Sequence, residues 1–306
     1  MAINTLEMAK IFQQELDKQM LTAGTSGWME ANASDVKYNG GDTVRMPMIS
    51  TSGLAKYDRD DGFNQGAVTL AYKDYTLTQD RGRTFQLDSM DVDESNFVAT
   101  AGTVMGEFQR TKVAPEIDAY RYSRIAALAK GASHESAAFT PSKDNILGKL
   151  DEEIAKIQDI VGEGEPLVII MPTPVRTILN NAKDVTRYLD VADFKAGEVS
   201  TKVKTYNEIP ILSVPSDRMK TAYVFGDGKT TGQEAGGYKP DTGAKAINWI
   251  IMARNVSIAI SKTDKVRIFD PDTNQKADAW KIDYRKFHDL WIPSNKLAGV
   301  WVNTGA

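Results

Sequence analysis

Residue types that commonly carry out catalysis are scarce in this chain. Its 306 residues include two histidines, His134 and His288, and no cysteine. The lack of cysteine excludes disulfides, thiolate zinc sites and cysteine nucleophiles. His134 lies in a small polar stretch without the spacing of a zinc site. A serine–histidine–aspartate triad would have to pair His288 with Asp289, which is expected on the opposite side of a strand. We therefore interpret His288 as a structural hydrogen-bonding residue beside Arg285.

Two short motifs resemble ligand-binding loops but lack residues that those loops require. Residues Gly226–Thr230 end in Gly-Lys-Thr, but position 223, where a phosphate-binding loop needs glycine, is Tyr223. Residues Asp270–Asn274 begin like a calcium loop, but Gln275 takes the place of the glycine and Lys281 that of the final glutamate. No catalytic, cofactor or metal site is predicted, and an enzyme such as a small hydrolase or nucleotide enzyme is disfavoured.

Composition and charge describe an ordinary globular protein. Hydrophobic residues make up 42% and charged residues 25% of the chain. The net charge of −4 gives no strong field to attract nucleic acid as a general binder would need. Charged residues interrupt residues 1–20, so this segment is neither a signal peptide nor a membrane helix. We expect a cytoplasmic product.

The first 88 residues predict an arm followed by a long ribbon. Residues 3–21 have apolar residues at roughly helical spacing, typical of a short amphipathic arm. Residues 44–48 and 68–72 alternate as two strands, with a charged tip at 53–62 between them. The tip aspartates could hold a cation weakly, although a solvated turn is the better interpretation. An isolated ribbon is marginal in water, so it needs a partner surface. Residues 75–88 predict a strand, a turn at Asp80–Gly82 and a second strand.

The central part of the chain predicts a long helix and then a sheet. Acidic residues at 91–95 favour a helix start, and Pro115 predicts a kink or restart within this helix. The apolar run Leu167–Met171 indicates a strand covered on both faces, followed by a helix that starts near Pro174. Further strands are predicted at 201–206, 209–214, 222–225, 247–252, 256–261, 266–269, 280–284 and 297–302, with a glycine-rich surface loop at 226–243.

The C-terminal thirty residues carry the most specific pattern, which predicts a strand, a polar corner and a second strand. Tyr284–Trp291 reads YRKFHDLW, and Asn295-Lys296 and Gly299–Val302 follow. This block resembles the C-terminal signature of tailed-bacteriophage major capsid proteins with the Hong Kong 97-like fold. In that family a YR-x-(F/Y)-HDL segment precedes NK and a Gly-aromatic strand. Further matches are Tyr57–Arg59 with Gly62, Asp80–Gly82, and Pro115–Asp118.

The resemblance implies an α+β capsid fold with defined parts. It implies an N-terminal arm at 1–41 and an extended β-hairpin loop at 42–88. The peripheral domain, with its long spine helix, would comprise 89–134 and 254–306. The axial domain would comprise 135–253.

The resemblance also implies a function and partners. The chain would form the icosahedral head shell of a tailed phage from hexamers and pentamers, enclosing double-stranded DNA without specific binding. It would be assembled in the host bacterial cytoplasm and become part of the virion, with a portal protein as partner and no membrane or cofactor. Because the arm follows Met1 almost immediately, we expect a separate scaffolding protein. An encapsulin-type compartment with the same architecture is the alternative.

The predicted contacts between subunits lie mostly at the ribbon tip. The family's type member links an extended-loop lysine to a neighbour's asparagine. Here Lys56 or Lys73 with Asn274 or Asn295 could in principle do so, but we predict a non-covalent lattice. The candidate contact residues are Leu54, Lys56, Tyr57, Arg59, Asp60, Asp61, Phe63, Arg81, Arg285 and His288.

Overall fold

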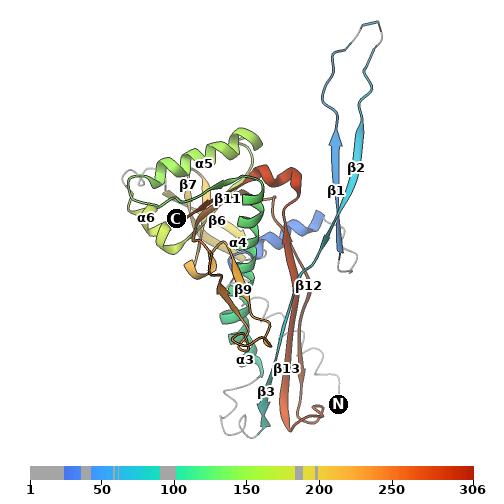
Figure 1. Cartoon of the computed structure of the whole chain (residues 1–306), viewed down its shortest axis with the longest axis vertical. Helices are drawn as coiled ribbons and strands as arrows, with labels where there is room; N and C mark the ends of the chain where they lie inside the picture. Colours follow the sequence, from blue (N-terminus) through green and yellow to red (C-terminus); the bar gives the residue numbers. More distant parts are fainter. Residues whose placement is uncertain are drawn as a thin grey trace.

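The computed structural model describes residues 24–35, 43–57, 59–60, 62–89, 101–182, 189–196 and 199–306. The predicted amphipathic arm at 3–21 and the predicted helix start at 91–95 lie outside these residues. The main parts of the described chain are a larger and a smaller sheet, a segmented helix and a projecting ribbon (Figure 1).

The larger sheet has seven strands and contains the main core. Every residue of β5 (Leu167–Pro172) is buried, as predicted for a strand covered on both faces, and so is every residue of β11 (Ile247–Ala253). Helices α5 (Ile146–Val161) and α6 (Thr173–Asn180) pack on this sheet, and α6 begins next to Pro174 as predicted. The strand order is β4 (Glu135–Ser136), β14 (Val300–Thr304), β11 (Ile247–Ala253), β5 (Leu167–Pro172), β8 (Ile209–Val214), β7 (Val199–Tyr206) and β6 (Leu189–Ala196).

The second sheet has three antiparallel strands, in the order β12 (Ile258–Phe269), β13 (Ala279–Trp291) and β3 (Gln79–Asp88). The YRKFHDLW segment lies inside β13, the short 3-10 helix η5 (Ser294–Gly299) contains Asn295 and Lys296, and β14 follows, so the predicted strand, polar corner and second strand are confirmed. The turn predicted at Asp80–Gly82 is wrong, because these residues pair with β13. Glycine is needed at position 82 because β3 and β13 approach each other closely there, and not because the chain turns. A Cβ atom at this position would lie 2.9 Å from the carbonyl oxygen of Tyr284.

The spine helix is built from three segments. α3 (Ala101–Phe108) continues into a π-helical segment, η2 (Gln109–Val113), and then into α4 (Ala114–Gly131). Pro115 lies in the first turn of α4, where its missing N–H is tolerated, so the predicted restart is confirmed. Met105 and Ile117 pack on the three-stranded sheet, whereas Ile125 and other residues of α4 join the core of the larger sheet. One helix therefore supports both sheets.

Two segments lie elsewhere than predicted. The C-terminal strand β14 pairs with β11 and β4 in the seven-stranded sheet, so the assignment of all of 254–306 to the unit of the spine helix is wrong for this strand. Val300 and Val302 are fully buried in that core, which explains the pairing. The glycine-rich segment forms a hairpin, with β9 (Tyr223–Phe225) paired to β10 (Tyr238–Pro240).

A short 3-10 helix, η1 (Gly27–Asp35), anchors the N-terminal part of the described chain. Trp28 and Met29 are buried in the main core. The buried carboxylate of Asp118 accepts hydrogen bonds from the backbone and side chains of Thr25 and Ser26. None of the described helices is long and apolar enough to span a membrane.

The predicted ribbon is present and projects from the body of the molecule (Figure 1). Strands β1 (Thr43–Thr51) and β2 (Val68–Thr76) pair antiparallel along their whole length. Val44 and Met46, at the base of the ribbon, are buried beside Ile258 and Trp291. The chain then passes through Leu77 and Thr78 directly into β3.

Candidate functional site

The distal part of the ribbon exposes large apolar side chains. Ile49 is 67%, Val68 73% and Tyr72 63% exposed. Monomeric soluble proteins seldom expose a contiguous apolar surface of this kind unless it contacts a partner. The ribbon is therefore the main candidate for an interaction surface.

The large apolar side chains that the distal ribbon exposes lie on one of its two faces. Directly paired residues of antiparallel strands share a face, and successive residues alternate between faces. The pairs Pro47–Tyr72 and Ile49–Leu70, together with Val68, therefore form one face, hereafter the apolar face. The other face has smaller and more polar pairs, which include Ser50–Thr69 and Met48–Ala71. Toward the base of the ribbon this second face carries Val44 and Met46, which pack on the body of the molecule, whereas the apolar face stays exposed.

The tip residues predicted to contact other subunits are exposed within this chain. Leu54, Lys56 and Tyr57 extend into solvent, and Phe63 is 90% exposed. The rings of Tyr57 and Phe63 meet edge to face, with centroids 4.9 Å apart. Arg59 and Asp60 are also exposed, whereas Asp61 lies outside the described residues.

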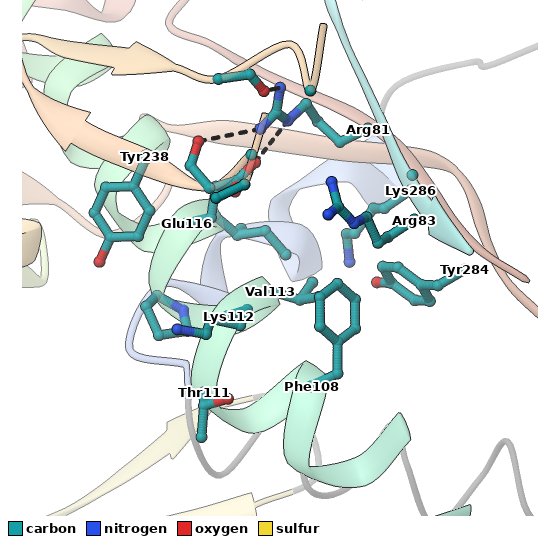
Figure 2. Close-up of a pocket in the computed structure, with 18 of the residues that line it drawn as sticks. Arg81, Arg83, Phe108, Thr111, Lys112, Val113, Glu116, Tyr238, Tyr284 and Lys286 are labelled. Carbon is teal, nitrogen blue, oxygen red and sulfur yellow. Dashed lines mark hydrogen bonds and ion pairs between the residues drawn. The ribbon is translucent and has the colours of Figure 1, made fainter. Parts of the chain in front are cut away.

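Arg81, another predicted contact residue, is engaged inside the chain. Its Nε donates to Glu116 on α4 at 2.7 Å, and its Nη1 donates to the carbonyl oxygen of Gly226 at 2.7 Å. Its Nη2 reaches the carbonyl oxygen of Gly237 at 3.3 Å. Figure 2 shows these contacts as dashed lines. Arg81 thus connects β3, the spine helix and the β9–β10 hairpin.

Arg285 and His288 point to opposite sides of β13. Arg285 is exposed and forms a two-pronged ion pair with Asp80, at 2.8 and 2.5 Å. The hydrogen bond from Arg285 lowers the pKa of Asp80. His288 is only 4% exposed. The hypothesis that His288 hydrogen-bonds beside Arg285 is wrong, and its burial also contradicts a side-chain contact with a neighbouring subunit.

Asp289 is a buried residue whose role sequence reasoning missed. Its carboxylate accepts hydrogen bonds from the Tyr120 hydroxyl at 2.6 Å and from the Thr78 hydroxyl at 2.8 Å. It joins β13 to the spine helix and to the segment that leads from the ribbon. Tyr120 contacts both residues, since its ring packs against the His288 ring and its hydroxyl donates to Asp289. The only signal in the sequence was its place in the HDL segment.

A hollow of about 1010 Å³ lies between the three-stranded sheet, η2 and the β9–β10 hairpin (Figure 2). Arg83 and Lys286 extend into it beside Phe108 and Tyr284. His288 also lines this hollow. It therefore connects a buried histidine with the molecular surface.

Neither of the two loop motifs forms a ligand site in the described part of the chain. The carboxylate of Asp227 accepts hydrogen bonds from the backbone N–H groups of Lys229 and Thr230. A bound phosphate would need these same N–H groups as donors. Asp270 similarly accepts hydrogen bonds from Thr273. Among the described residues, no group of three or more histidines and carboxylates is placed to hold a metal ion.

Solved structures from several phages share this fold. The mature capsid of bacteriophage PhiM1 matches with a TM-score of 0.58 and 11% identity, over 88% of this chain and 83% of that chain. The capsid structure of cyanophage P-SCSP1u matches with a TM-score of 0.56 and 10% identity, over 87% and 84%. A structure from Microbacterium phage Oxtober96 matches with a TM-score of 0.55 and 12% identity, over 90% and 91%.

No protein-family model and no curated protein sequence matches the chain. The structural likenesses show the fold. The chain has the α+β fold of phage capsid proteins that the C-terminal pattern predicted.

Proposed function

We propose that this chain is the major capsid protein of a tailed phage and that copies of it assemble into a closed icosahedral shell of hexamers and pentamers. The observation that carries the proposal is the apolar face of the projecting ribbon, whose large side chains are more than half exposed and would be buried by a neighbouring copy. The capsid fold supports the same conclusion. In this proposal the role is structural, and the chain catalyses no reaction.

The energetics favour the apolar face over the charged tip as the main source of affinity. Burying a side chain such as Ile49 or Leu70 contributes about 1.5–3 kcal/mol. An exposed ion pair at the tip, formed by Lys56 or Asp60, contributes about 0–1 kcal/mol. Small contributions per subunit accumulate because each contact is repeated by symmetry across the shell. The tip residues are therefore proposed to set register, and the apolar face to hold the lattice.

The proposal includes the partners that a phage head needs. These are a separate scaffolding protein, a portal protein and packaged double-stranded DNA that is held without specific binding. The shell would be assembled in the host bacterial cytoplasm and become part of the virion. Expression of the chain alone should give irregular particles, and co-expression with the scaffolding protein should give uniform ones.

The ribbon provides a direct test with a matched control. In one variant Ile49→Asp and Leu70→Asp place two charges on the apolar face. In the control Ser50→Asp and Thr69→Asp place the same charges one residue away, on the opposite face. Sedimentation velocity and electron microscopy should find large particles for the wild type and the control, and only small species for the apolar-face variant.

Two results would contradict the proposal at different levels. A wild-type chain that stays monomeric with and without its scaffold would exclude a shell protein. An apolar-face variant that assembles like the wild type would exclude this face as the contact and leave the shell intact. Particles from infected cells should contain nuclease-protected DNA, whereas protein cargo in its place would indicate an encapsulin-type compartment.

A further inference from the structure

His288 lies where the spine helix meets the three-stranded sheet. Its ring contacts the ring of Tyr120 on α4 edge to face, with centroids 5.6 Å apart. Its Nδ1 atom is buried and has no hydrogen-bond partner among the described residues. Its neighbours across the sheet, Ser261 on β12 and Gln79 on β3, carry no charge. The ring thus packs against Tyr120 with one of its nitrogens, Nδ1, unpartnered.

Three cations act on this ring, and each of them is paired with a carboxylate. Arg121 on α4 and Lys286 on β13 are both buried, and Arg81 on β3 is the third cation. Arg121 is paired with Glu30 of η1, and the Lys286 Nζ lies 2.6 Å from Asp264. Burial, together with the three cations, holds the pKa of the histidine well below its usual value.

The nearby carboxylates are already engaged by other groups. Asp289, the next residue along β13, accepts hydrogen bonds from Tyr120, from Thr78 and from its own neighbour Leu290. Asp118, farther toward the start of α4, binds Arg218 at 2.9 Å in addition to the N-terminal segment. A protonated histidine would therefore meet cations without gaining an anion.

We propose that His288 makes the contact between α4 and β13 sensitive to acid. The neutral ring packs against Tyr120. Protonation adds a positive charge beside Arg121, Lys286 and Arg81, and this favours states in which the two elements separate and the ring meets water. The hollow lined by His288 gives protons and water a path to the ring. The inference concerns the fold and does not depend on the proposed function.

The direction and size of the effect follow from linkage. In the separated state the histidine regains an ordinary pKa of about 6.5. The folded pKa lies below this value, so stability is fully present above pH 6.5 and is lost as the pH falls toward the folded pKa. Between pH 7.5 and pH 5.0 the equilibrium constant for separation should rise, with an upper limit of about 30-fold set by the gain in protonation of a group with a pKa of about 6.5.

Hydrogen exchange of the whole chain measures this separation. Exchange of amides in α4 and β13, corrected for the intrinsic pH dependence of the chemistry, should increase severalfold in the wild type at the lower pH, up to the limit of about 30-fold. His288→Phe keeps a ring against Tyr120 but cannot bind a proton, and it should remove the increase. His134→Gln changes the chain's other histidine and should leave the increase intact.

A second measurement keeps the test decisive if His288→Phe misfolds. The chain has two histidines, so the His134→Gln variant leaves a single histidine signal in a spectrum of labelled protein. That signal should not titrate at pH 6.5 while the fold is intact. A midpoint at or above pH 6.5, or an unchanged acid response in a folded His288→Phe protein, would overturn the inference.

Discussion

At the scale of single residues, buried polar groups connect parts of the chain that are distant in sequence. Glu153 on α5 is fully buried. It accepts hydrogen bonds from the Trp249 indole at 2.6 Å and from the Asn303 amide at 2.7 Å. Burial raises the pKa of its carboxyl group, while the hydrogen bonds oppose that shift. One carboxylate thus holds α5, β11 and β14 together.

Removing this carboxylate should destabilise the fold. Glu153→Ala leaves the Trp249 and Asn303 donors buried without an acceptor, at a cost of about 1–3 kcal/mol each. We expect the free energy of unfolding to fall by about 2–4 kcal/mol, measured by urea denaturation. Glu152→Ala is the matched control. Glu152 is the residue next to Glu153 on α5, but it is exposed and pairs with Lys149 and Lys156. The control should change stability by less than about 1 kcal/mol, and an equal loss in both variants would refute the role of Glu153.

At the scale of secondary-structure elements, Arg81 ties three elements together. Its planar guanidinium bonds Glu116 on α4 and two carbonyl oxygens of the β9–β10 hairpin at the same time. The hairpin belongs to the segment between strands of the larger sheet, whereas β3 belongs to the smaller one. The relative position of the two sheets at this point therefore depends on a side chain with a forked geometry.

Arg81→Lys should loosen the hairpin without removing the charge. Lysine cannot reproduce the forked contacts, and losing a hydrogen bond to a charged group costs about 1.5–3 kcal/mol. Hydrogen exchange in residues 223–240 should then accelerate by roughly tenfold or more. Arg83→Lys is the control, since Arg83 makes one long hydrogen bond, 3.4 Å, to the carbonyl oxygen of Glu234. Equal acceleration in the two variants would argue against Arg81 as the connecting residue.

At the scale of the whole molecule, the question is whether a shell built from this chain is held by covalent bonds. Lys73 donates to Ser294 within its own chain, and Asn274 donates to the carbonyl oxygen of Ala279. The fully buried carboxylate of Glu153 is engaged by Trp249 and Asn303 inside the core and not by Lys73 or Asn274. These contacts support a non-covalent lattice.

Denaturing electrophoresis of boiled mature particles decides between the two kinds of lattice. A non-covalent shell should give one band near 33.7 kDa. A ladder of multimers would show covalent linkage. Lys56→Arg and Lys73→Arg would then identify the lysine, because arginine keeps the charge but does not form the amide bond.

Local patterns in the sequence determined the elements that depend on neighbouring residues. Alternation of apolar residues predicted the ribbon, the apolar run predicted β5, and Pro115 predicted the restart of the spine helix. These features follow from side-chain period and backbone geometry, which act over a few residues. The C-terminal pattern indicated the fold because several motifs in a fixed order, rather than one short motif, resembled those of phage capsid proteins.

Contacts between distant segments decided the rest. The partner of β14, the burial of His288 and the pairing of Asp80–Gly82 with β13 depend on residues tens to hundreds of positions away. Gly82 is the clearest case, since glycine suits both a turn and a close approach between strands. Only the position of the Tyr284 carbonyl, set by packing of the two strands, shows that close approach is the reason.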